Sequence, residues 1–379
     1  MADQLGPRAA LVVTCQGRLV GVEEDGGGEA GLSPAVLSRP GAPAGDGAGR
    51  PVAGPSADAF GILHDAFLAD VVQVAVPPRT GLEHPVVVVH LVDPTPGEEG
   101  APSCFPHLHV RVGPGAQAGV VEVVAAVGGH REAPALVVPV ADLEVEDGAR
   151  LAYANLQVLG TAATHVGLQR STVGAEGTLR SFTLGLGGSY ARVRTDSELV
   201  GQGGRSALLA AYLGVGEQVH DFRTTQDHHA PRTESELLFT GAVADTARSV
   251  YSGLIRIRRG ARRADARQTN HNLVLSEGAH ADSVPNLDID ENDVRCSHAS
   301  TVGPIDEEQR YYLESRGIEP RAAERLIVGG FFADMAARCP FPDVGRWTTL
   351  AVAERLAGRL PAEQDDGAAA PLAGASADG

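Results

Sequence analysis

The stretch DARQTNHNLVLSEGAHADSVPNLDIDENDVRCSHASTVG, residues 265–303, decides the fold because it combines strand-like runs with turn residues. Residues 272–275, 283–289 and 293–298 are predicted to be extended segments. Gly278-Ala279 and Glu291-Asn292, which separate these segments, are typical of turns. The stretch therefore predicts short strands that follow one another closely, with no long helix between them.

The same stretch contains a candidate site. Side chains at positions i and i+2 of a strand share a face, so Cys296 and His298 are predicted to point the same way, roughly 6 to 7 Å apart. A thiol and an imidazole on one wall could bind a metal or a sulfur species. The alternative is that Cys296 is a small buried apolar residue and His298 an ordinary hydrogen-bonded one, which is the more common situation for each residue type.

Turn signals recur along the rest of the chain. From residue 113 to residue 278, glycine-containing turns separate short alternating runs such as 181–184 and 254–257. This spacing predicts either a β-sandwich or a parallel β-helix, and periodicity alone does not choose between them. Glycine at tight corners followed by small residues suits the β-helix. Further strands are predicted at 10–14, 71–76, 84–92 and 107–112, and a short helix at 60–70.

Two blocks carry a resemblance to a known family. The sequence DHHAPRTESELLFTGAVADTARSVYSGLIRIRRGA, residues 227–261, resembles a motif block of the SufB/SufD family of iron–sulfur cluster assembly scaffolds. Residues 265–303 resemble the end of that family's core, and SRGI at 315–318 resembles the start of its terminal helical hairpin. The resemblance covers roughly residues 59–338 and is closer to the SufD branch. It implies a right-handed parallel β-helix.

The resemblance also implies a function. It suggests a non-catalytic scaffold that pairs with a SufB-like subunit through its last β-helix rungs and binds a SufC-like ABC ATPase through its C-terminal helices. The family's functional positions correspond to Cys296 and His298, which would hold transient iron or an iron–sulfur cluster with ligands from the facing subunit. The family's Gly-Ala after the His is Ala299-Ser300 in this chain. No tightly bound cofactor is expected, and the assembly step and any flavin are left open.

The predicted organisation has four parts. Residues 1–58 form an N-terminal strand and a flexible linker rich in Gly, Pro and Ala, a reduced version of the family's N-terminal region. Residues 59–303 form the β-helix core, residues 304–361 form C-terminal helices, and residues 362–379 form a disordered tail.

The C-terminal helices are the predicted docking site for the ATPase. One helix begins after Asp306 and ends at Gly317, a second begins at Pro320, and a third spans 348–360. The second helix is apolar on more than one flank, which indicates a partner. The predicted contact residues are Tyr312, Val328, Phe331 and Phe332, with Phe332 as the main anchor. The alternative is that Phe332 fills the end of the β-helix.

Composition excludes several classes. A net charge of -17 argues against nucleic-acid binding and a membrane surface. No apolar run reaches 18 residues and no secretory signal is visible, so we expect a cytoplasmic protein without membrane insertion. The four Cys form no CxxC pair, which argues against a disulfide framework. Lysine is absent, so there is no Walker A loop, and any ATP must be bound by another chain.

Two further function classes are retained as alternatives. A β-helix enzyme acting on polysaccharide is weakened because aromatic residues make up only 4% of the chain and the single Trp, Trp347, lies outside the strand region. A purely structural β-repeat protein is the other. The His107/His109 pair is predicted to be two solvent-facing strand residues rather than a metal site. The five acidic residues within 282–293 could match a partner's basic edge, although such runs are usually solvated faces.

Overall fold

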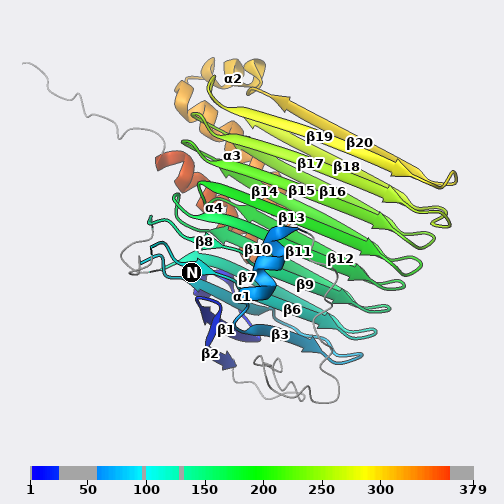
Figure 1. Ribbon diagram of the computed structural model, residues 1–379. Coiled ribbons are helices and arrows are strands. Elements are labelled where there is room, and N and C mark those ends of the chain that lie inside the picture. The colour runs from blue at the N-terminus through cyan, green and yellow to red at the C-terminus, as the bar shows by residue number, and fades with distance from the viewer. Residues whose placement is uncertain (1, 25–57, 96–99, 128–131, 359–379) are drawn as a thin grey trace, which may run out of the picture.

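The computed structural model describes residues 2–24, 58–95, 100–127 and 132–358. Its core is a stack of short strands that runs from the N-terminal to the C-terminal part of the chain (Figure 1). Strands of neighbouring turns pair in parallel, and the chain alternates between two walls. This arrangement confirms the parallel β-helix and rules out a sandwich of antiparallel strands.

Ten strands form sheet A, the first wall, among the described residues: β1 (Ala10–Cys15), β2 (Arg18–Glu24), β4 (Val86–Val92), β7 (Gln117–Ala126), β10 (Arg150–Val158), β12 (Thr178–Gly185), β14 (Arg205–Gly214), β16 (Glu234–Val243), β18 (Asp265–Val274) and β20 (Arg295–Gly303). Sheet B, the second wall, consists of β3 (Val71–Val76), β6 (His107–Val112), β9 (Val140–Val145), β11 (Thr164–Val173), β13 (Tyr190–Leu199), β15 (Val219–His228), β17 (Arg248–Ile257) and β19 (His280–Ile289), with the short β5 (Ser103–Cys104) and β8 (Leu136–Val137) beside them.

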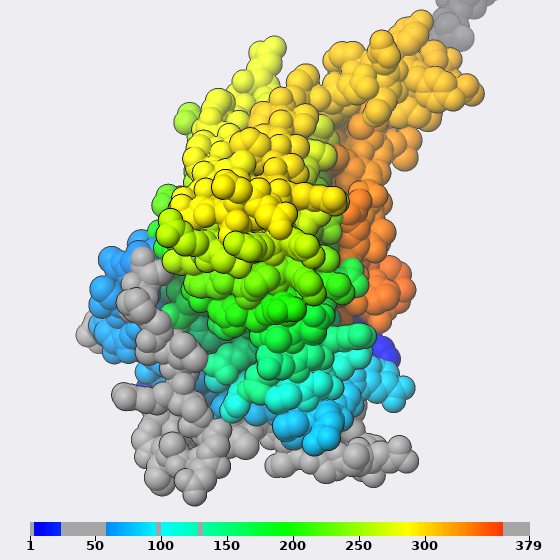
Figure 2. All heavy atoms as spheres, turned by 90° about the vertical axis from the view of Figure 1, so that its right-hand side faces the viewer, coloured from blue at the N-terminus to red at the C-terminus, as the bar shows by residue number. Residues whose placement is uncertain are grey.

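Helices flank the two walls. The described helices are a 3-10 turn, η1 (Ala2–Leu5), and α1 (Ala59–Phe67), α2 (Glu307–Glu314), α3 (Pro320–Ala337) and α4 (Pro342–Gly358). Figure 2 shows α3 and α4, in orange and red, running along one side of the stacked rungs. None of the helices in the described ranges has the length and apolar character needed to cross a bilayer.

Most predicted elements coincide with observed ones. The strands predicted at 71–76 and 107–112 are β3 and β6. The strand predicted at 10–14 is β1, which pairs with β4 and therefore extends sheet A. Three details differ: the strand predicted at 272–275 is only the end of β18, β2 was not predicted, and α4 begins at Pro342 rather than at residue 348. Most of the predicted linker (residues 25–57) and the predicted tail lie outside the described residues.

The corners that lead from sheet B to sheet A are stacked by backbone hydrogen bonds. In every such corner from residue 79 to residue 263, one residue has a left-handed backbone, and its N–H donates to a carbonyl of the next corner: Arg79, Gly115, Gly148, Glu176, Gly203, Arg232 and Arg263. Glycine adopts this conformation at no steric cost, whereas Glu176, Arg232 and Arg263 are strained there. The bond to the next corner, 2.8 Å for Arg232 N–H to the Arg262 carbonyl, offsets part of that strain.

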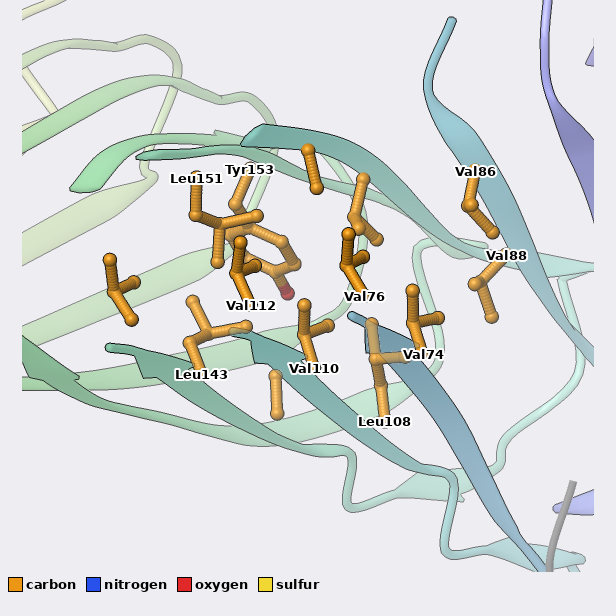
Figure 3. Close-up of a cluster of buried hydrophobic side chains, with 14 of the residues drawn as sticks. Val74, Val76, Val86, Val88, Leu108, Val110, Val112, Leu143, Leu151 and Tyr153 are labelled. Carbon is orange, nitrogen blue, oxygen red and sulfur yellow. The ribbon is translucent and has the colours of Figure 1, made fainter. Parts of the chain in front are cut away.

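The interior of the first rungs is packed with β-branched and leucine side chains. Figure 3 shows valines and leucines of both sheets meeting between the walls, among them Val74, Val110 and Leu151. Because paired strands are in register, each inward side chain stacks on the inward side chain of the next rung. Burial of these columns is the main driving force for the fold.

Sheet A is apolar on its outer face as well. On β14, Leu208 and Tyr212 point inward, whereas Leu209 and Leu213 belong to the cluster that packs against the helices. Phe332 of α3 lies in that cluster and is 0% exposed. A strand buried on both faces needs a continuous apolar run rather than an alternating one, which explains the sequence of β14.

Farther along the stack the interior becomes polar. His165, His220 and His228 are all buried inside it. Both ring nitrogens of His165 and of His220 have no hydrogen-bond partner among the described residues. Burial lowers the pKa of His220 from its ordinary 6.5 to about 3, with a further contribution from Arg355, and burial lowers the pKa of His165 to about 4. These histidines are therefore neutral in the folded protein.

The position of Phe332 generates a stability prediction. Replacing a fully buried phenylalanine by alanine leaves a cavity between α3 and sheet A, so Phe332→Ala should lower the free energy of unfolding by about 3 to 5 kcal/mol in urea titrations. Leu326→Ala on the same helix is the matched control, since Leu326 is 57% exposed and should cost less than about 1 kcal/mol. Equal effects of the two changes would contradict the packing described.

The buried histidines generate a pH prediction. Unfolding raises the pKa of His220 from about 3 to about 6.5, so the unfolded chain binds an extra proton between these values. The free energy of unfolding should thus be at its full value above pH 6.5 and fall below it. His220→Leu should flatten this fall by up to about 1.4 kcal/mol per pH unit, measured by urea titration at several pH values. Phe222→Leu, which removes packing beside His220 but no titrating group, should shift the curve without changing its slope.

Candidate functional site

The C-terminal end of the β-helix is open. Among the strands that the structure describes, β20 is the last of sheet A and pairs with β18 alone, and β19 is the last of sheet B and pairs with β17 alone. In Figure 1 these two strands end the stack, with α2 beside one of their ends. Their outer edges carry unpaired backbone N–H and C=O groups, which are ready to pair with another strand.

Register places Cys296 and His298 on the inner face of this open end. Cys296 lies opposite Ala266 and His298 lies opposite Gln268, and both of these β18 residues are buried in the interior. In-register parallel stacking directs the β20 residues the same way. With no further rung above them, Cys296 is only half-buried and His298 is exposed.

The surroundings of Cys296 keep its thiol protonated. Cys296 packs on an apolar cluster formed by Ile255, Ile257 and Ala266. Burial raises the pKa of the thiol, and the carboxylate of Asp265 raises it further. The thiolate is the form that binds metals, so a metal or a positively charged partner must displace this proton.

The rim of the open end is both acidic and apolar. Asp282 and Asp288 of β19 are more than half exposed, and Asp293 at the following corner is 66% exposed. Arginines of the preceding turn contact part of this charge, as in the 2.9 Å pair of Arg256 with Asp288. Four apolar side chains on the same two strands are exposed: Val284, Leu287, Ile289 and Val302.

The described residues of the open end do not form a complete set of metal ligands. Among the described residues, no group of three or more His, Cys, Asp or Glu side chains has an arrangement that could hold a metal ion. Cys296 and His298 supply a soft sulfur and a nitrogen, two donors that suit iron. Any site here needs its remaining ligands from another chain.

The His107/His109 pair lies elsewhere, on the outer face of sheet B. His107 is buried beneath α1, with its ring 5.1 Å from that of His64 and its Nε2 3.2 Å from Asp142. His109 lies 3.2 Å from Glu144. The expectation that both face solvent is therefore corrected, because α1 and neighbouring carboxylates cover them.

Asp227, the first residue of the 227–261 block, has a structural role. Asp227 accepts hydrogen bonds from both Nε and Nη2 of Arg258 on the next turn. His228 is buried, with its ring nitrogens 2.7 Å from Thr233 and 2.8 Å from Ser235. The Asp227–Arg258 pair holds successive turns together, whereas the contacts of His228 fix the passage from β15 to β16.

The predicted partner-binding residues fall into two groups. Tyr312 of α2 is 55% exposed, and α2 has no buried residue. Val328 and Phe332 of α3 are fully buried against sheet A, and Phe331 is partly buried there. Burial thus favours the alternative for Phe332, in which it belongs to the chain's own core.

Two exposed apolar residues of the same helices were not predicted. Tyr311 is 73% exposed and Leu326 is 57% exposed. Sheet A contacts the flank of α3 that carries Val328 and Phe332, and leaves Leu326 exposed. Helical periodicity shows that flanks differ, but it does not say which flank meets the sheet.

A family model and several individual proteins all indicate the same family for this chain. The family described as "SUF system FeS cluster assembly, SufBD core domain" matches residues 95–331. An iron-sulfur cluster assembly SufBD family protein of Mycobacterium tuberculosis is 36% identical over 220 residues, which is 56% of this chain and 55% of that protein. The iron-sulfur cluster assembly protein SufD of Escherichia coli is 28% identical over 302 residues, 80% of this chain and 70% of that protein.

The corresponding SufD of Bacillus subtilis is 34% identical over 199 residues, 52% of this chain and 46% of that protein. The chain thus spans about half the length of the mycobacterial and Bacillus relatives. The family match, residues 95–331, contains most of the β-helix.

The environment of Cys296 generates a reactivity prediction. Asp265→Asn removes the negative charge that raises the pKa of the Cys296 thiol, so alkylation of Cys296 by iodoacetamide at pH 8 should become about twofold faster or more. The rate can be followed by mass spectrometry of the peptide that contains Cys296. Asp288→Asn, which neutralises another carboxylate of the open end, serves as the control and should leave the rate unchanged. An unchanged rate in Asp265→Asn would show that burial alone sets the reactivity.

Proposed function

This chain belongs to the SufBD core family of the SUF iron–sulfur cluster assembly system, and from that premise we propose that it is a non-catalytic scaffold subunit of a SUF-type complex. The observation that carries the proposal is the open end of the β-helix, where Cys296 and His298 share one uncovered inner face. A scaffold of this kind supplies ligands and an interface rather than a reacting group of its own.

The proposed partner at the open end is a SufB-like subunit. The edges of β19 and β20 offer backbone groups for continued strand pairing. The exposed Leu287, Ile289 and Val302 offer apolar surface, and the acidic rim favours a partner edge that carries positive charge. Pairing in register would continue both walls into the partner and cover the inner face.

The proposed cargo is iron or a transient iron–sulfur cluster. His298 would offer a neutral ring nitrogen and Cys296 a thiolate once its proton is displaced. A cluster usually takes four ligands, so the partner supplies the rest. Ala299 lies opposite Thr269 on the outer face and Ser300 opposite Asn270 on the inner face. The residues that replace the family's Gly-Ala therefore add only one group, the Ser300 hydroxyl, to the wall of the site.

The proposed ATP-hydrolysing partner is a SufC-like ABC ATPase, docked on α2 and the exposed flank of α3. An eight-residue helix with no buried side chain gains little from its own chain. Tyr312, with the guanidinium of Arg316 4.3 Å above its ring, is a rigid aromatic anchor on this surface. The proposal also includes a cytoplasmic location for this protein.

The site assignment is tested by His298→Ala in the assembled complex. One exposed imidazole contributes little to folding, so the thermal transition and the yield of complex should stay near those of the unsubstituted protein. Cluster accumulation during anaerobic reconstitution, followed by iron and sulfide analysis, should be lost. His280→Ala, which removes an exposed histidine from the outward face of β19, should accumulate clusters normally. Normal cluster accumulation by His298→Ala would contradict the assignment of His298 to the site.

The ATPase surface is tested by Tyr312→Asp. Removal of an aromatic anchor should weaken binding of the ATPase by about 2 kcal/mol or more, measured by calorimetry, with little change in thermal stability. Leu350→Asp on α4, a residue of similar exposure outside the proposed surface, should bind normally. If both variants bind with unchanged affinity, the ATPase contacts another part of the chain.

A further inference from the structure

A buried polar side chain lies directly beneath the candidate site. Gln268 of β18 is paired in register with His298 and is 1% exposed. Its amide nitrogen and its amide oxygen both lack a hydrogen-bond partner among the described residues. Leaving a buried donor or acceptor unsatisfied costs about 1 to 3 kcal/mol, so an amide in this position calls for a physical explanation.

The rung below and the strand across the interior shape the space around this amide. Leu237 lies on the rung below Gln268 and offers no polar atom. Across the interior lies Gly253, where a Cβ would collide with Nε2 of Gln268 and with the hydroxyl of Tyr251. The missing side chain at Gly253 therefore provides the space that the amide occupies. The Tyr251 hydroxyl is itself engaged with Thr224 at 3.0 Å.

The imidazole of His298, on the rung above, can use the amide as a hydrogen-bond acceptor. A histidine that binds a metal through one ring nitrogen normally donates the N–H of the other to a fixed acceptor, which sets the tautomer and the ring orientation. Neighbouring strands are about 4.8 Å apart, so an amide on β18 can reach an imidazole that stands above it on β20.

We propose that Gln268 is a positioning residue for His298. Its Oε1 accepts the N–H of the imidazole, and the other ring nitrogen is thereby presented to iron when a partner subunit closes the open end. In the free chain the amide oxygen has no donor, because the imidazole N–H is oriented toward it only in the complex. This inference rests on the proposed function, and it adds a residue that lies outside the Cys296/His298 pair.

The test compares Fe(II) affinity in the anaerobically assembled complex for two substitutions of similar length. Gln268→Met removes both polar atoms, so the affinity should fall about tenfold or more. Its thermal transition should stay unchanged or rise, because an unpaired buried amide is lost. Gln268→Glu keeps an acceptor oxygen at the same reach and should restore the affinity to within about threefold. A residue that only supported packing would not show this difference between Met and Glu.

Two reference variants separate the possible failures. Gln169→Met removes another buried glutamine, which bonds Ser181 in the middle of the stack, and should leave Fe(II) affinity unchanged. If His298→Ala weakens Fe(II) binding while Gln268→Met does not, the role of Gln268 is overturned and the proposed function stands. If neither change weakens binding, the site itself is overturned. If Gln268→Met weakens binding and Gln268→Glu fails to restore it, the amide acts as a donor, and the acceptor role is overturned.

Discussion

In-register parallel pairing of neighbouring turns is the constraint on which the rest of this structure depends. It fixes which side chains face inward, because each strand repeats the orientation of the strand before it. Columns of like side chains follow, apolar in the first rungs and polar farther along. The same rule turns Cys296 and His298 toward the interior, even though no strand of the described ranges lies above them.

Local sequence signals were enough to predict part of the fold. Turn residues and β-branched runs located β3, β6 and the last three strands, and capping residues located α2 and α3. Periodicity could not separate a β-helix from a sandwich, because the distinction lies in which strands pair, a long-range property. The family resemblance made that choice.

The candidate site was only partly predictable. An i, i+2 spacing was enough to place Cys296 and His298 on one face. The sequence left two interpretations of Phe332 open, a partner anchor or a core residue, because an apolar flank looks the same whether it contacts a sheet or a partner. The burial of Phe332 favours the second. Gln268 gave no signal at all, since a polar residue in a strand is usually solvent-facing. Its burial beneath His298 follows from register, which only the three-dimensional structure provides.

The open end has a further consequence for cooperativity. In a stack of this kind each rung contacts only its neighbours, so the stability of a rung depends on its interfaces with the rungs next to it. The final pair, β19 and β20, is supported from one side and belongs to the least stable part of the core, where local opening takes the least energy. A subunit that adds its own rung would convert this terminal pair into an interior one. Assembly and the last step of folding would then be a single thermodynamic event, with the inner face that carries Cys296 and His298 covered only in the joined protein.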